Sequence, residues 1–389
     1  MNKFLLLLIF ATIACESNLT PAPTIEPTNL AQPTPQSLAT MRPFETAPPT
    51  GELNTHERSP QYVITRSSIF WIKRSQPFQL YAFDRGSGNV SKSLYSGKLK
   101  SGYAGDIKAD KTGGEWLVAL EAFSKYVNPD ALLHVINTQD FSKSFILDLT
   151  DAKTLGYRPN YATLSTDIDN GKIMLSFLTI GSDSAPCPES VIVLYDIASR
   201  SVRLVDKGPC IENTYLFSGG HLQGTYLVVS KDYSDAAGGG NDVVLHDIAS
   251  SSILTFTRSD KKAGEPDVSR EGVVVWKAGA GRFDMASAFE YVDTKSGLRK
   301  TVALPAGVTE PKFYIYDSWI HVRGPMGEDS DLVIYDIRSN SYQIIQKGSP
   351  ASGKALGALD FVDTTVAWYE FNYPNVTDDF VLHWKPLQP

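Results

Sequence analysis

A short plan of alternating apolar and polar segments recurs seven times between Ile69 and Trp384. Each repeat contains an apolar run, a polar loop, a second apolar run and a turn that usually begins with Asp or Asn. The turns begin at Asp84, Asn137, Asp196, Asp247, Asp293, Asp336 and Trp384. Successive turns lie 43 to 59 residues apart, a period typical of a propeller blade with four strands. The chain is therefore predicted to be an all-β, seven-bladed β-propeller of four-stranded antiparallel blades.

The apolar runs have the composition of buried strands. They are short, rich in β-branched and aromatic residues, and nearly continuous, as in residues 226–229 and 273–276. Such runs indicate strands that are covered on both faces. In the third repeat the four strands are expected at residues 161–165, 173–178, 191–195 and 202–206. The turn aspartates are expected to accept hydrogen bonds from nearby backbone N–H groups, which is a structural role.

The last repeat ends after its third strand, at residues 381–384. Closure of the ring then requires residues 51–59 as the missing outer strand, or else this blade has only three strands. A closing strand would tie the two ends of the domain together and remove open sheet edges.

Three segments that precede innermost strands carry a further signal. They are Gly264-Glu265-Pro266-Asp267, Thr309-Glu310-Pro311-Lys312 and Tyr157-Arg158-Pro159-Asn160. Together with the Tyr-Asp-Ile turns, they resemble the repeats of TolB-like propellers, and the resemblance covers roughly residues 60–389. It implies the architecture and leaves the function open, because that superfamily includes both binding modules and enzymes.

The N-terminus has the features of an export signal. Lys3 precedes an apolar stretch at residues 4–13, which is too short to span a bilayer. The segment Thr12-Ile13-Ala14-Cys15 resembles the lipobox of bacterial lipoproteins, although Thr12 stands where that family usually has Leu. The resemblance implies that Cys15 becomes the lipidated first residue, and the alternative is ordinary cleavage after Ala14. We expect a signal peptide at residues 1–15 and an envelope protein that is lipid-anchored on the extracytoplasmic side.

A segment of distinct composition separates the signal from the propeller. Residues 16–57 are rich in Pro, Thr, Ser and Gln. A segment of this composition cannot bury enough apolar area to fold. It is predicted to be a disordered linker, followed by the propeller domain at residues 58–389.

The three cysteines are expected to have two different roles. Export permits a disulfide, and an odd thiol is unusual in an exported protein. Cys187 and Cys210 are expected to pair, because the loops that carry them emerge on the same face of a meander, which leaves Cys15 for the lipid. The alternative is two unpaired thiols.

Several features of the sequence argue against a cofactor, a metal site and nucleic-acid binding. Residues 348–354 fit a phosphate-binding loop, but Ala355 follows where Ser or Thr is needed, and no helix is predicted there. Residues 167–171 hint at a calcium loop, yet the glycine comes too early. A net charge of −7 and the absence of a basic cluster disfavour nucleic acid. We therefore expect no cofactor and no metal.

The predicted function is non-catalytic binding or scaffolding through the loop face, with a polar ligand or a protein or glycan partner. The loops between second and third strands are long and varied, which suits an interaction face. Five charged residues are expected to line the mouth of the central channel: Arg158, Glu212, Glu265, Glu310 and Lys354. Such a ring would suit a sugar or a basic peptide, or it is only a solvated rim. The alternatives are a structural subunit of an envelope assembly, and a glycan-active enzyme, a lyase or a hydrolase, with its site in the central funnel.

Overall fold

The computed structural model divides the chain into two compact units, of which the second comprises Thr46–Pro389. All of the described residues lie in this second unit. They are residues 50–55, 61–73, 75–91, 93–99, 103–112, 114–122, 131–160, 163–180, 188–208, 215–233, 240–258, 260, 262–279, 286–305, 308, 312–323, 331–348, 354–372 and 380–387.

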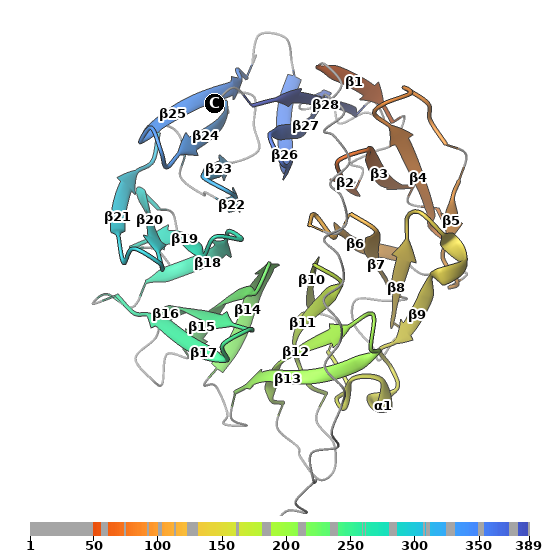
Figure 1. Ribbon diagram of the computed structural model, residues 1–389, viewed down its shortest axis with the longest axis horizontal. Coiled ribbons are helices and arrows are strands. Elements are labelled where there is room, and N and C mark those ends of the chain that lie inside the picture. The colour runs from red at the N-terminus through yellow and green to blue at the C-terminus, as the bar shows by residue number, and fades with distance from the viewer. Residues whose placement is uncertain are drawn as a thin grey trace, which may run out of the picture. The chain divides into compact units, whose positions relative to one another are not determined.

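The second unit is a ring of seven four-stranded antiparallel sheets, as predicted (Figure 1). Its blades are numbered along the chain, and each begins at the central channel. The innermost strands are β2 (Gln61–Ile64), β6 (Tyr103–Ala109), β10 (Ser165–Asp169), β14 (Tyr215–Gln223), β18 (Ala263–Val268), β22 (Lys312–Tyr316) and β26 (Lys354–Val362). The second strands are β3 (Ser68–Lys73), β7 (Trp116–Ala122), β11 (Lys172–Leu178), β15 (Tyr226–Tyr233), β19 (Val273–Ala278), β23 (Trp319–Arg323) and β27 (Thr365–Asn372).

The outer half of each blade completes the sheet. The third strands are β4 (Gln79–Asp84), β8 (Ala131–Asn137), β12 (Ser190–Asp196), β16 (Gly240–Asp247), β20 (Ala288–Asp293), β24 (Leu332–Asp336) and β28 (Val381–Pro386). The outermost strands are β5 (Tyr95–Ser96), β9 (Phe145–Asp148), β13 (Ser201–Lys207), β17 (Ser252–Phe256), β21 (Arg299–Ala303), β25 (Ser341–Gln346) and β1 (Gly51–Asn54). The described helices are η1 (Phe141–Lys143) and α1 (Ala152–Leu155), and neither has the length or apolar character that a membrane crossing requires.

The ring is closed by its two ends. Strand β1 pairs antiparallel with β28, with Gly51 opposite Trp384 and Leu53 opposite Leu382, so blade 7 has four strands. The backbone N–H and the hydroxyl of Thr55 both donate to the carbonyl of Phe380 at 3.2 Å. A Cβ at Gly51 would lie 2.2 Å from the Trp384 ring. The folded unit therefore includes residues upstream of position 58, where the sequence analysis began the domain.

The turns between third and fourth strands confirm the structural role expected for their aspartates. Asp196 accepts from Ser199 N at 2.8 Å, and Asp84 accepts from Ser87 N at 2.7 Å. These backbone hydrogen bonds hold the pKa of both carboxyls below its ordinary value. Each such turn fixes the register of the outer hairpin of its blade.

Blade 3 differs from the prediction at its first strand. The strand begins at Ser165, where the predicted strand ended. Asn170 and Gly171 both have positive φ, at 48° and 66°, and form a tight turn that pairs Asp169 with Lys172. The left-handed conformation of these two residues places the hairpin turn there and so sets the register of the strand.

The core lies between neighbouring blades. Buried side chains of adjacent sheets pack face to face, as where Ile69 and Trp71 of blade 1 meet Leu382 and Trp384 of blade 7. Each sheet is thus covered on both faces, which explains the nearly continuous apolar runs in the sequence.

Candidate functional site

One residue of each innermost strand faces a shared cavity on the axis of the ring. They are Val63, Asp106, Asp167, His221, Asp267, Tyr314 and Asp360. Each of them is followed in the sequence by a buried apolar residue. Their strands surround the axis in Figure 1, and the cavity between them has a volume of about 290 Å³. This volume is near the lower end of the range for small-molecule sites.

Four of the inner strands have a β-bulge at this position or just before it. The register shifts lie between Ala104 and Ile107, Ser218 and His221, Gly264 and Asp267, and Gly357 and Leu359. A bulge changes the face to which the following side chains point. The bulges thereby place Asp106, His221, Asp267 and Asp360 at the cavity.

Of the four aspartates at this strand position, three link neighbouring blades. Asp167 accepts from Ile168 N of its own strand and from Leu222 N of blade 4, both at 2.9 Å. Asp267 accepts in the same way from Val268 N at 2.7 Å and from Ile315 N of blade 6 at 2.8 Å.

Asp360 repeats this arrangement where the ring closes. It accepts from Phe361 N at 3.0 Å and from Ile64 N of blade 1 at 3.1 Å. Both oxygens of Asp167, Asp267 and Asp360 are therefore engaged by backbone donors. Asp106 accepts from Ile107 N at 3.0 Å, and its second oxygen lies 3.6 Å from Lys108 Nζ.

Two lysines of blade 2 enter this acidic cavity. The carboxylates of Asp106, Asp167 and Asp360, together with Tyr314, raise the pKa of Lys108 despite the opposing effect of burial. Lys111 contacts Asp360 of blade 7. Burial alone would lower its pKa, but Asp360, Asp167 and Asp267 outweigh burial and raise it. The interior of the channel therefore stabilises positive charge.

His221 contributes an imidazole to the lining of the cavity. Its Nδ1 lies 3.7 Å from Asp167 and 3.6 Å from Asp267. Burial raises the pKa of Asp267, while His221 and the two backbone donors oppose that rise. The ring of Tyr314 stands edge-on to His221 at 6.4 Å and stacks on His321 at 5.9 Å. An imidazole between two carboxylates can hold or transfer a proton.

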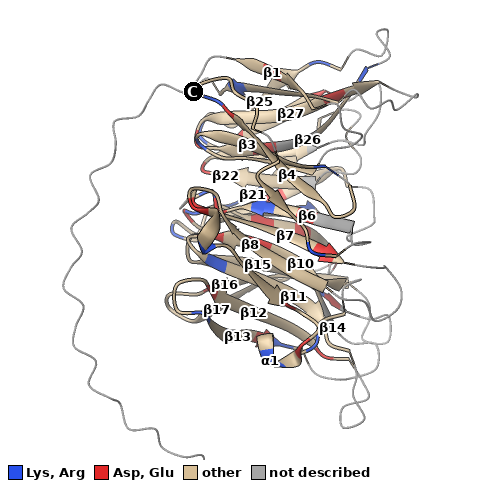
Figure 2. Cartoon of the chain, turned by 90° about the vertical axis from the view of Figure 1, so that its right-hand side faces the viewer, with Lys and Arg blue, Asp and Glu red and all other residues tan. Residues whose placement is uncertain are grey.

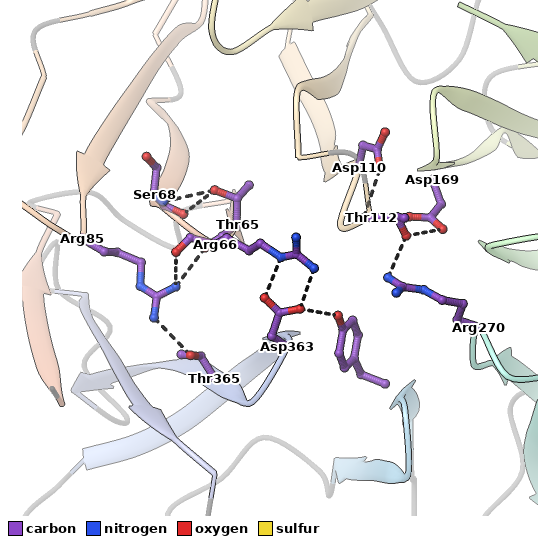
Figure 3. A network of polar contacts seen from close by, with 11 residues as sticks. Thr65, Arg66, Ser68, Arg85, Asp110, Thr112, Asp169, Arg270, Asp363 and Thr365 are labelled. Carbon is purple, nitrogen blue, oxygen red and sulfur yellow. Dashed lines mark hydrogen bonds and ion pairs between the residues drawn. The ribbon is translucent and has the colours of Figure 1, made fainter. Parts of the chain in front are cut away.

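Long side chains cross the channel at the end where the inner strands turn outward. Arg270 of blade 5 reaches Thr112 of blade 2 at 2.9 Å, and Thr112 in turn donates to Asp169 (Figure 3). Gln223 of blade 4 donates to the carbonyl of Ile315 in blade 6 at 2.9 Å. The contacts of Arg270 and Gln223 each join two blades that are not neighbours, and they narrow this end of the channel.

A second set of charges lies at the same end. Arg66 and Asp363 form a two-point ion pair at 2.7 and 3.1 Å, and Tyr316 donates to Asp363 at 3.0 Å (Figure 3). Arg85 donates to the carbonyls of Thr65 and Arg66. This network fastens blades 1, 6 and 7 together beside the ring closure.

The five residues expected at the channel mouth are not brought together by the part of the chain that the structure describes. Glu212 and Glu310 lie outside the described residues. Arg158, Glu265 and Lys354 do not line the cavity. Glu265 lies 3.5 Å from Lys277, and Lys354 contacts Glu370. Cys15, Cys187 and Cys210 also lie outside the described residues.

The cavity residues had a signal in the sequence that was not used. An Asp followed by a buried apolar residue recurs in four inner strands, at Asp106-Ile107, Asp167-Ile168, Asp267-Val268 and Asp360-Phe361. The prediction chose Glu265, two positions before Asp267. The bulge between Gly264 and Asp267 explains the difference, because it breaks simple alternation along the strand.

Comparison with known proteins shows the fold alone. No family model matches the chain, and no curated protein sequence matches it. The propeller domain of the Trilobed protease from Pyrococcus furiosus, described as having an open velcro topology, aligns with a TM-score of 0.53 at 11% identity, covering 86% of this chain and 97% of that one. An oligogalacturonate lyase from Vibrio parahaemolyticus aligns with a TM-score of 0.53 at 10% identity, covering 86% and 96%. A chain of the Mitotic Checkpoint Complex aligns with a TM-score of 0.52 at 13% identity, covering 96% and 100%.

The chain is a β-propeller. Its structural neighbours include a protease domain, a lyase and a component of a large assembly. Propellers of this shape serve different functions, so the function must be argued from the chemistry of the channel.

Proposed function

We propose that this propeller is a non-catalytic binding protein that receives a polar, positively charged group in its central channel. The observation that carries the proposal is the excess of carboxylates over lysines in the cavity, which is lined by Asp106, Asp167, Asp169, Asp267 and Asp360 but only by the two lysines Lys108 and Lys111. The carboxylates that already contact these resident cations would also attract a cation from a ligand. A basic side chain of a peptide partner has the charge and the slender shape that the cavity requires.

The hydrogen bonding of the aspartates supports binding rather than catalysis. Asp167, Asp267 and Asp360 each accept from backbone groups of two blades. A general acid or base must exchange a proton with a substrate, and engagement with these fixed donors opposes that role. Asp106, with 44% of its side chain exposed, is the cavity carboxylate best placed to meet a ligand.

Replacement of Asp106 by Asn is expected to weaken binding of a short oligolysine peptide about tenfold, since one close charge pair in a partly screened site is worth roughly 1 to 4 kcal/mol. Isothermal titration calorimetry with the full chain measures this. Glu271→Gln removes one negative charge from an exposed turn and is the matched control. The proposal is wrong if the unsubstituted protein does not bind oligolysine, or if Asp106→Asn and Glu271→Gln have the same effect.

We further propose that Cys15 carries a lipid that anchors the protein on the extracytoplasmic side of a membrane, with the segment between Cys15 and the start of β1 as the connecting linker. The lipobox-like segment at residues 12–15 supports this assignment. Cys15→Ser is expected to move the exported protein from the membrane fraction to the soluble fraction. Fractionation followed by immunoblotting measures the partition, and Cys187→Ser combined with Cys210→Ser, which keeps Cys15, is the matched control. An unchanged partition for Cys15→Ser would contradict lipid anchoring.

A second candidate function is favoured by His221. An imidazole that faces a cavity within 3.7 Å of two carboxylates has the geometry of a proton-transfer group. Together with the fold shared with an oligogalacturonate lyase, this makes β-elimination of an acidic glycan the reaction to test. Formation of unsaturated sugar ends from polygalacturonate, abolished by His221→Gln, would establish the enzyme. Absence of such products would leave binding as the function.

A further inference from the structure

A second cavity lies outside the central channel, between blades 2 and 3. Its volume is about 520 Å³, within the range of small-molecule sites. The blade 2 side consists of Trp116, Phe145 and Lys143, and the blade 3 side is formed by the turns at residues 170–172 and 196–200. It shares no lining residue with the channel, so the two cavities are separate sites.

The apolar part of this cavity is aromatic. The rings of Trp116 and Phe145 meet edge to face at 6.2 Å, and Phe145 packs against Tyr195 at 6.1 Å. Trp116 and Phe145 are half-buried and line the cavity. Flat aromatic surface of this kind suits the C–H face of a sugar ring, which is apolar while its edge carries hydroxyl groups.

The polar part of the cavity is positively charged. Lys143, Lys172 and Arg200 line it, against one carboxylate, that of Asp196. Asp196 is occupied by its own turn, where it accepts from Ser199 N at 2.8 Å and from Ser199 Oγ at 2.9 Å. This local excess of positive charge occurs in a chain with a net charge of −7. Figure 2 shows acidic and basic residues interspersed over the strands, so the concentration of cations in one crevice is a local feature.

Arg200 is held in a conformation that the fold does not favour for arginine. Its φ is 53°, and the equivalent turn positions in blades 4 and 6 are Ser251, at 58°, and Asn340, at 53°. Positive φ disfavours long side chains and suits Asn. Arg200 nevertheless occupies this position and places its guanidinium group 5.1 Å from the centre of the Phe145 ring. The guanidinium lies over the Phe145 ring, where it can bind a carboxylate at two points.

From these observations we infer a second binding site, for a carboxylated sugar of the uronic-acid type. The sugar ring packs against Trp116, while its carboxylate contacts Lys172 and Arg200, whose guanidinium covers Phe145. A neutral sugar would offer no carboxylate to these two cations, and a small inorganic anion would leave the aromatic surface uncovered. The site lies outside the channel, so the variants at Arg200 and Lys172 test it separately from a cation or an acidic glycan bound in the channel.

Calorimetric titration of the full-length protein with trigalacturonate tests the site. Arg200→Asn combined with Lys172→Gln is expected to weaken binding at least about tenfold, because charge-assisted hydrogen bonds to the carboxylate are lost. The Asn introduced is the residue that blade 6 has at this position, so the turn is preserved, and a thermal melt checks the fold. The matched control is Lys295→Gln combined with Arg338→Gln, which removes two cations from the corresponding turns of blades 5 and 6.

Three further measurements separate the outcomes. Maltotriose, a neutral trisaccharide, is expected to bind at least tenfold more weakly than trigalacturonate, and added salt is expected to weaken trigalacturonate binding. Asp106→Asn is expected to leave trigalacturonate affinity unchanged while it weakens oligolysine binding, so the two proposals fail separately. The inference is overturned if trigalacturonate does not bind, if maltotriose binds equally well, or if the site variant binds as tightly as the control variant.

Discussion

A chain that begins at His56 is expected to melt at least about 5 °C below a chain that begins at Thr46. The shorter chain lacks β1, the outer strand of blade 7. It loses the pairing of Gly51 to Asn54 with β28 and both hydrogen bonds from Thr55 to Phe380. Each backbone hydrogen bond contributes about 0.5 to 1.5 kcal/mol to stability, so the free energy of unfolding is expected to fall by about 4 kcal/mol. For domains of 150 to 250 residues, 1 kcal/mol corresponds to roughly 2 to 4 °C, and less for larger ones.

Loss of β1 also exposes the edge of β28, and an open edge pairs with other chains. The shorter chain is therefore expected to self-associate on warming, which light scattering during the melt would detect. The chain that begins at Thr46 is the control, because it keeps the whole compact unit. Equal melting temperatures for the two chains would show that β1 does not stabilise the ring.

Replacement of Asp267 by Ala is expected to reduce the free energy of unfolding by about 3 to 5 kcal/mol. Asp267 is 3% exposed, and its carboxylate accepts from Val268 N and Ile315 N. The substitution leaves both N–H groups without this acceptor, at about 1 to 3 kcal/mol each, and opens a small cavity. It also removes the link between blades 5 and 6. Denaturant unfolding measures the difference.

Asp106→Ala is the matched control, because Asp106 occupies the same position in blade 2 and accepts from Ile107 of its own strand. We expect a loss of about 1 kcal/mol or less, since the side chain is 44% exposed. If Asp267→Ala is no more destabilising than Asp106→Ala, the inter-blade hydrogen bonds do not hold the ring together.

The same aspartate predicts a pH dependence. Burial raises the pKa of Asp267 in the folded protein, so the folded state binds this proton more readily than the unfolded chain does. Stability from this group is therefore gained as pH falls through the folded pKa towards about 4, and lost as pH rises. Asp267→Asn lacks this contribution. The stability of the unsubstituted protein relative to Asp267→Asn is expected to increase between pH 7 and pH 4.5, and a constant difference would contradict the assignment.

The sequence predicted the blades, but it did not identify the side chains that line the cavity. Asp196 and Asp336 were correctly assigned to turns, because the interaction of an Asp with the N–H groups that follow it depends only on nearby residues. Glu265 was chosen for the channel on its place before a strand, whereas the bulge in β18 turns Asp267 to the cavity. A bulge depends on how two strands pair, and a single strand does not reveal it.

By itself, the sequence determined the number of blades and the order of strands, and it gave residues 51–59 as one of two ways to complete the last blade. These follow from apolar runs, turn residues and the length of the last repeat, all of which are local along the chain. Only the tertiary structure decided which side chains share a cavity. Asp360 meets Ile64 across 296 residues, and Arg270 meets Thr112 across 158. The closed ring brings such pairs together because each contact depends on the position of every blade between them.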